Sequence, residues 1–147
     1  MTTTTDTTNI RVRRRRALTV AGATLAPVVP WLVAQVTGTE LEVTLGGQAP
    51  MVIGLPIVLG TALAAALAGW AALAVLRRVS RHGRAVWTGL AVAGLLGSFL
   101  PLASAEASGA TTTYLALAHV AVAAVLIPGL RGTVPSRPAG ATERSRA

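Results

Sequence analysis

One polar side chain with potential for chemistry lies near the middle of each of four long apolar runs in this chain: Thr24, Thr61, Ser98 and His119. His119 lies roughly 12 Å into the last run, by the rise of an α-helix. A neutral imidazole there could accept a proton, or form a hydrogen bond with one of the three hydroxyl groups. An ionisable side chain deep in apolar surroundings costs free energy, so this cluster is the first candidate for a functional site.

The surroundings of His119 limit that chemistry. No Asp or Glu lies within an apolar run, so a proton relay through His119 would have no carboxylate partner. Zinc sites use roughly three or four protein ligands, and His82, the other histidine, falls between two runs. A structural, hydrogen-bonded, neutral His119 is the favoured interpretation. A proton-sensitive or ligand-contacting role is the alternative.

Catalytic sequence motifs are absent. The chain has no GxSxG, HExxH, phosphate-loop or dinucleotide-binding pattern. It also has no cysteine, which excludes disulfides and thiolate metal ligands. We therefore expect no enzyme activity, no catalytic residue, no cofactor and no bound metal.

The apolar runs that carry the four polar residues are long enough to cross a bilayer. Hydrophobic residues make up 52% of the chain and charged residues 12%, which is too apolar for an ordinary soluble domain. A helix needs about 20 residues to cross ~30 Å of hydrocarbon. The runs predict membrane-spanning helices over about 17–36, 51–76, 85–103 and 111–130.

The charged residues alternate in sign along the gaps between the runs. All 13 basic residues are arginines, and they precede the first run, separate the second from the third, and follow the fourth. The other two gaps carry Glu40, Glu42 and Glu106 and no arginine. By the positive-inside rule, this pattern predicts a plasma-membrane protein with both termini in the cytoplasm.

The arginines next to the runs should also contact anionic lipids of the inner leaflet, with a gain of about 1 kcal/mol each. Their place beside apolar runs argues against nucleic-acid binding, despite a net charge of +8. The arginines that we expect to set the topology and contact lipid are Arg13, Arg14, Arg15, Arg16, Arg77, Arg78, Arg81, Arg84 and Arg131.

The segments outside the runs are short and polar. Residues 1–16 and 131–147 have the composition of disordered, basic cytoplasmic segments on either side of a transmembrane domain over 17–130. In the gap 37–50, apolar residues at 41, 43 and 45 alternate with polar ones, which predicts a short extended segment. That segment could lie on the helix ends or pair with a partner.

Small residues repeat every four positions along two neighbouring runs, which suggests how the helices associate. Helices in lipid pack through small residues that let backbones approach. Because a short turn joins the two runs, we expect these ridges to face each other within one chain, with homodimerisation as the alternative. The ridges are Gly60, Ala64, Ala68 and Ala72 in the second run and Gly89, Ala93 and Gly97 in the third.

The prolines and tryptophans within the runs lead to predictions about helix kinks and about packing. Each proline within a run frees a backbone carbonyl one turn earlier. Ordinary kinks are the favoured reading, and a shallow cavity above His119 in the outer half of the bundle is the alternative. These prolines are Pro27, Pro30, Pro56 and Pro101. Trp87 is expected at the inner membrane boundary, and Trp70 deeper, as a packing residue.

Four segments together resemble a family of small four-helix integral membrane proteins from actinobacteria that is catalogued only as a domain of unknown function. They are RRRRALTVAG, TELEV, RRVSRHGRAVWTGLA and TTTYLALAHVAVAAVLIPGL, and the resemblance covers about Arg13 to Leu130. It implies a multi-pass inner-membrane protein, and that His119 and Pro128 belong to a pattern. It implies no activity.

The sequence thus predicts an all-α, four-helix transmembrane bundle with both termini in the cytoplasm. The favoured function is that of a non-enzymatic accessory or scaffold subunit, in contact with the lipid bilayer and with a membrane-protein partner or further copies of itself. One alternative is a small oligomeric channel or transporter, with Thr24, Thr61, Ser98 and His119 along a polar path. The other is a membrane sensor of pH or lipid that depends on His119.

Overall fold

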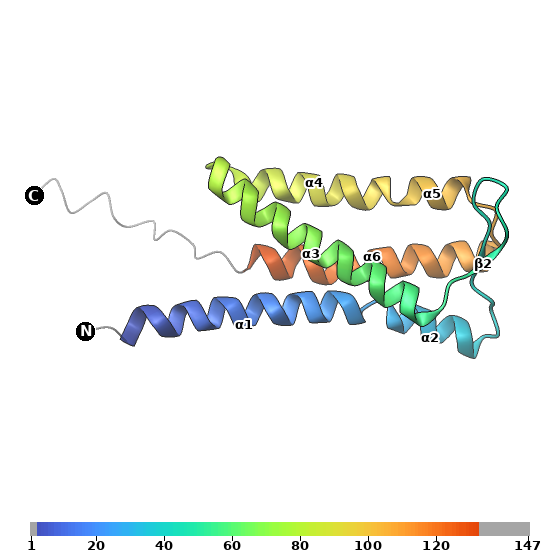
Figure 1. The fold of residues 1–147 in the computed structure, drawn as a ribbon, viewed down its shortest axis with the longest axis horizontal. Helices are drawn as coiled ribbons and strands as arrows, with labels where there is room; N and C mark the ends of the chain where they lie inside the picture. The colour runs from blue at the N-terminus through green and yellow to red at the C-terminus, as the bar shows by residue number, and fades with distance from the viewer. Residues whose placement is uncertain (1–2, 133–147) are drawn as a thin grey trace, which may run out of the picture.

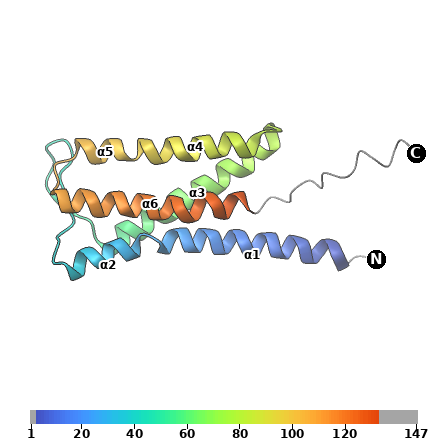
Figure 2. The same cartoon turned by 180° about the vertical axis from the view of Figure 1, so that it is seen from behind.

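The structure, a computed structural model, describes residues 3–132, with side chains from Ile10 onward. Six helices and a small hairpin follow one another along the chain. They are α1 (Thr3–Leu25), α2 (Val28–Val36), β1 (Glu42–Val43), β2 (Met51–Val52), α3 (Leu55–Val79), α4 (Gly83–Gly97), α5 (Phe99–Ser104) and α6 (Gly109–Arg131). The helices lie roughly lengthwise in one bundle, and α3 runs obliquely across it (Figures 1 and 2).

Four spans arise from these helices, which confirms the predicted all-α bundle. Among the residues described, four stretches are long and apolar enough to cross a membrane: Ile10–Val36, Leu55–Val79, Gly83–Ser104 and Gly109–Arg131. Their length and composition indicate a multi-pass membrane protein. Between 6% and 22% of each span's most apolar window is buried inside the bundle, so most residues of these windows keep some accessible surface.

Prolines account for the two breaks in the spans. Pro27 separates α1 from α2, and the chain resumes its helical bonding when Trp31 N donates to Pro27 O at 3.2 Å. Pro101 has no N–H for the carbonyl of Gly97, and the third span is interrupted at Ser98, between α4 and α5. Pro128 lies inside α6, which continues to Arg131.

Two helix starts differ most from those expected. The first helix begins at Thr3, so residues 3–16, for which the sequence predicts disorder, are helical. Once the span is helical, each further turn adds hydrogen bonds without a new nucleation cost. The second span begins at Leu55 and not near residue 51, because Met51 and Val52 form β2 and Pro56 favours a helix start. Of the basic tail expected over 131–147, all but Arg131 and Gly132 lies outside the described residues.

The extended segment predicted in the gap 37–50 is present as β1. It pairs antiparallel with β2, with Val43 opposite Met51. Gly46 and Gly47 have φ of 57° and 74°, the positive values that a type I′ hairpin turn requires at both central residues. Thr44 also exchanges backbone hydrogen bonds of 3.0 Å with Glu106, so this hairpin is tied to the loop before α6.

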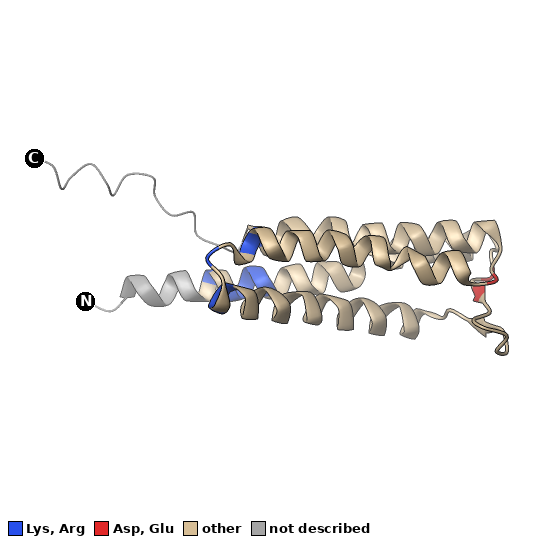
Figure 3. Cartoon of the chain, turned by 90° about the horizontal axis from the view of Figure 1, so that it is seen from above, with Lys and Arg blue, Asp and Glu red and all other residues tan. Residues whose placement is uncertain are grey.

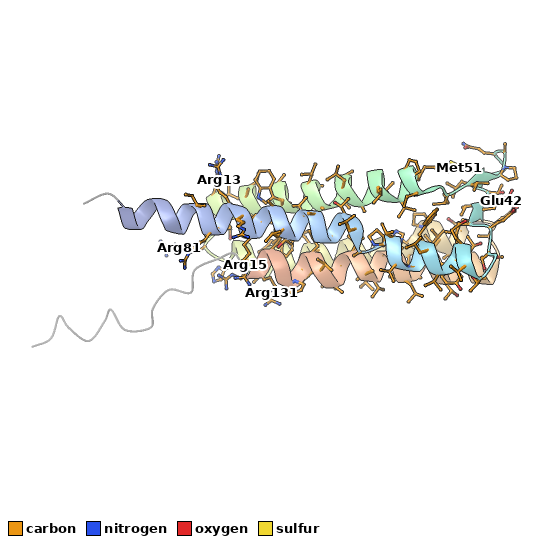
Figure 4. All side chains as sticks on the ribbon, turned by 90° about the horizontal axis from the view of Figure 1, so that it is seen from below. Arg13, Arg15, Glu42, Met51, Arg81 and Arg131 are labelled. Atoms are coloured by element: carbon orange, nitrogen blue, oxygen red, sulfur yellow. The ribbon has the colours of Figure 1, made fainter. Side chains whose placement is uncertain are left out.

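The charged residues divide between the two ends of the bundle. The described arginines lie at one end and Glu40, Glu42 and Glu106 at the other, next to the hairpin (Figure 3). We call these the arginine end and the hairpin end. Arg13, Arg15, Arg81 and Arg131 mark the first and Glu42 the second in Figure 4.

Six buried apolar side chains form one packed cluster that joins four helices. They are Ala23, Ala66, Leu73, Trp87, Leu126 and Leu130, from α1, α3, α4 and α6. Trp87 is 2% exposed and therefore packs in this core. Trp70, expected to pack inside, is 41% exposed.

Candidate functional site

The four polar residues singled out by the sequence do not form hydrogen bonds with one another in the structure. Each bonds to a backbone carbonyl of its own helix, one turn or less away. Thr24 Oγ1 donates to Val20 O at 2.9 Å, Thr61 Oγ1 to Ile57 O at 2.7 Å, and Ser98 Oγ to Leu95 O at 2.6 Å. These local bonds satisfy the hydroxyl groups without a partner from another helix.

Three of the four nevertheless line one cavity. Thr61, Ser98 and His119 lie around a cavity of about 510 Å³ between α3, α4 and α6. Thr24 instead lines a separate groove between α1 and α3. The structure therefore brings together three of the predicted residues and separates the fourth from them.

The imidazole of His119 is held in one orientation. Its Nδ1 lies 2.7 Å from Leu115 O, and since a carbonyl oxygen only accepts, Nδ1 is the donor. In the neutral ring, Nε2 is then left as an acceptor. The Phe99 ring lies against the imidazole, with ring centroids 6.1 Å apart at an interplanar angle of 42°. His119 thus adds a hydrogen-bond acceptor to a largely apolar cavity that Thr61 and Ser98 also line.

Trp87 also lines this cavity, a role that sequence reasoning missed. Its indole Nε1 donates to Gly69 O at 2.8 Å, and the buried ring packs in the core beside Leu126. The signal that could have indicated the contact is the tryptophan itself, because an indole N–H needs a hydrogen-bond acceptor when the ring is buried.

The cavity exists because α3 and α4 meet at their short turn and then diverge (Figure 1). The two ridges of small residues were expected to face each other, and this expectation is wrong. On α3, only Ala68 and Ala72 of the ridge line the cavity, and Gly60 is exposed. On α4, the cavity is lined from Trp87 to Ser98 by other residues, and the ridge faces away. A step of four residues advances about 40° around a helix, so a long ridge cannot stay on one contact.

The prolines make a smaller contribution to the cavity than the small residues do. Pro27 lines it, whereas Pro30, Pro56 and Pro101 do not. Small side chains from both neighbouring helices, such as Ala65, Ala91 and Gly94, leave most of the volume open. The cavity follows the cluster of small residues more closely than it follows carbonyls freed by proline.

The arginines expected to set the topology gather at one end of the bundle. Among them, Arg15 Nη1 donates to Gly132 O at 2.8 Å, which ties α1 to the end of α6. A cation at the C-terminal end of a helix is favourable for the helix dipole. No group of three or more His, Cys, Asp or Glu that could hold a metal occurs among the residues described.

In the described residues, the hydroxyl groups near His119 are not hydrogen-bonded to its imidazole. A nucleophile needs a base within hydrogen-bond reach, and the hydroxyls of Thr61 and Ser98 are bonded to their own helices. The free imidazole acceptor can receive a hydrogen bond from a hydroxyl or amine of a lipophilic molecule.

Comparison with known proteins shows a match to a protein family. No curated protein and no solved structure matches the chain. A family model described as "Family of unknown function (DUF6069)" matches residues 7–136, a range that includes all of Arg13 to Leu130 and the three helices that line the cavity. The chain therefore belongs to the DUF6069 family of unknown function.

Proposed function

We propose that this protein is a non-enzymatic accessory or scaffold subunit of the plasma membrane, with both termini in the cytoplasm, that works by binding another membrane protein. The separation of charge between the arginine end and the hairpin end supports this orientation, because positive residues favour the cytoplasmic side.

One observation carries the binding role: the third span is largely uncovered. The most apolar window of Gly83–Ser104 is 6% buried, the lowest value of the four spans. Gly89, Ala93 and Gly97 are exposed along the side of α4 away from the His119 cavity, and a Cβ added at either glycine would meet nothing within 4 Å. Such a ridge permits a second helix to pack closely.

The hairpin end offers a polar contact surface next to this helix. Glu42 is exposed on β1, and Glu106 is exposed where its backbone pairs with Thr44. Thr111, 1% exposed, fixes the hairpin to α6, since its Oγ1 donates to Glu40 O at 3.2 Å. The exposed carboxylates are therefore presented on a fixed loop, and they suit a partner with basic residues at the same membrane surface.

Co-purification tests the proposal. The protein is purified in mild detergent from its native membrane, and proteins that elute with it are identified and quantified by mass spectrometry. We expect one protein in fixed stoichiometry. Gly89→Leu combined with Gly97→Leu should remove it, because the larger side chains fill the ridge.

The matched control is Gly60→Leu, at an exposed glycine of α3 that also has nothing within 4 Å of a Cβ. It should leave the partner bound. A photo-crosslinker placed at Ala93 should join the same partner directly. A homo-oligomer without a second protein that moves a solute in liposomes would overturn the proposal in favour of a channel or transporter. The channel has less support, since Thr24 lies apart from the other polar residues.

A membrane sensor is a second candidate, and the acceptor nitrogen of His119 favours it. Trp87 lines the same cavity, so its fluorescence should report a change there. In a variant with Trp31→Phe and Trp70→Phe, the emission should change on protonation or on addition of a lipophilic alcohol. His119→Gln should abolish the change and His82→Gln, at the exposed turn, should not. An unchanged emission in all conditions would exclude this function.

A further inference from the structure

A second hollow lies on the opposite side of α3 from the His119 cavity. It is a groove of about 700 Å³ between α1 and α3. Its apolar wall includes Leu63, Leu67 and Trp70, which recur at helical spacing on one face of α3. Arg13 and Arg16 line it towards the arginine end. We call it the arginine groove.

The two arginines are placed on the groove by the periodicity of α1. Arg13 and Arg16 are three residues apart, and Ala17, Val20 and Thr24 continue the same face deeper into the bundle. One face of α1 therefore changes from cationic to apolar along the groove. Arg15, by contrast, points to α6, where it bonds to Gly132 O.

One side-chain nitrogen of Arg16 has no hydrogen-bond acceptor. Its Nε is buried and has no hydrogen-bond partner, the one such side-chain nitrogen or oxygen in the part of the chain that the structure describes. A buried donor on a cationic group is costly when it stays unpaired. A phosphate in the groove can accept charge-assisted hydrogen bonds from the guanidinium groups of Arg13 and Arg16, which line it.

We propose that the arginine groove binds one anionic glycerophospholipid. Its phosphate lies between Arg13 and Arg16, and one acyl chain runs along Leu63, Leu67 and Trp70. Charge complementarity sets the position of the headgroup, and the apolar wall sets that of the tail. The chain also covers the Trp70 ring, which is 41% exposed in the chain alone.

The groove suits a lipid better than a partner helix. Its cationic part lies at the arginine end, where Figure 4 labels Arg13, and in the proposed orientation this end meets the phosphates of the inner leaflet. Its apolar part leads from there into the bundle, so a single amphiphile satisfies both. The site lies on α1 and α3, away from the ridge of α4, and does not depend on the accessory role proposed above.

Native mass spectrometry of the purified protein tests the site. The protein in detergent is titrated with phosphatidylglycerol or with phosphatidylcholine of the same acyl chains. We expect one phosphatidylglycerol to remain bound preferentially. Arg13→Gln combined with Arg16→Gln should weaken its binding by about tenfold or more, because charge-assisted hydrogen bonds to the phosphate are lost.

Arg77→Gln combined with Arg78→Gln is the matched control, since it removes the same charge from exposed arginines outside the groove. It should retain the lipid. Equal loss in both double variants would overturn the site in favour of general attraction to the arginine end. Equal retention of the two lipids by the wild type would overturn headgroup recognition.

Two bulky substitutions, one inside the groove and one outside it, test the site without a change of charge. Ala21→Trp fills the groove from an exposed position of α1 and should reduce phosphatidylglycerol binding by a similar factor. Ala124→Trp, at an exposed position of α6 that lines neither hollow, should not. A bound lipid that survives both the arginine and the Ala21 substitutions lies elsewhere and overturns the proposal.

Discussion

Thr19 of α1 lies against Gly129 of α6, and its side chain fills the space that a Cβ at position 129 would occupy. The Oγ1 of Thr19 is 2.7 Å from that position, and its Cγ2 is closer still. Three residues further along α1, Gly22 faces Val125, whose Cγ1 is 3.3 Å from an added Cβ. The close approach of helices in this bundle therefore occurs between the first and the last helix.

Gly129→Ala should destabilise the protein, by about 1–3 kcal/mol, because the new methyl group has no room beside Thr19. Within a helix, glycine to alanine is otherwise favourable by about 0.5–1 kcal/mol. Thermal unfolding in detergent, followed by circular dichroism, measures the change. The expected result is a lower midpoint temperature than that of the wild type.

Gly60→Ala is the control for this prediction, since nothing lies within 4 Å of its added Cβ, and it should leave the midpoint unchanged or raise it. Adding Thr19→Ala to Gly129→Ala should recover part of the loss, because the Cγ2 and Oγ1 atoms are removed. Independent, additive effects of the two substitutions would contradict the contact.

Trp87→Phe should cost about 1 kcal/mol, because the buried indole N–H that donates to Gly69 O is lost. The same substitution at Trp70, which is exposed, should have a much smaller effect. Urea or thermal unfolding of both variants gives the comparison. Equal stability of the two variants would show that the hydrogen bond between α3 and α4 contributes nothing.

The positions of the spans and the sorting of charge could be predicted from the sequence, because both depend on local composition. Apolar runs of sufficient length become helices in lipid whatever their neighbours. The extended segment at Glu42 and Val43 was also predictable, since alternation and two glycines are local signals. Its pairing with Met51 and the backbone bond of Thr44 to Glu106 depend on the relative positions of two loops. The sequence alone does not indicate these contacts.

The packing between helices could not be predicted, because small residues occur on several faces. Gly60 and Gly89 had the spacing of contact ridges and are exposed, whereas Gly22 and Gly129 form the close crossing. This crossing depends on how α1 lies beside α6. The residues in contact there are separated by most of the chain, so no local pattern indicates their pairing. For the same reason, Thr24 was grouped with His119 although it faces the arginine groove.

Gly47→Ala should loosen the hairpin without unfolding the bundle. Gly47 has a φ of 74°, where an L side chain costs about 1–2 kcal/mol. Amide hydrogen exchange of Thr44 and Ile53, which donate to Glu106 O and Leu41 O, should become about five- to thirtyfold faster. Gly109→Ala, at a glycine with open space and no positive φ, should leave these rates unchanged. Faster exchange throughout α3 would contradict a local effect.

Single cysteines should reveal the orientation in the membrane, because the chain has none of its own. Leu45→Cys lies in the hairpin and His82→Cys in the turn before α4, and both positions are exposed. In intact cells, a membrane-impermeant maleimide should label Leu45→Cys and reach His82→Cys only after permeabilisation. The physical reason is the positive-inside rule acting on the arginines around the turn.

The cysteine-free parent controls for background, and a reporter fused at Ala147 should remain in the cytoplasm. The opposite labelling pattern would place the arginine end outside, and the proposed orientation would then be wrong.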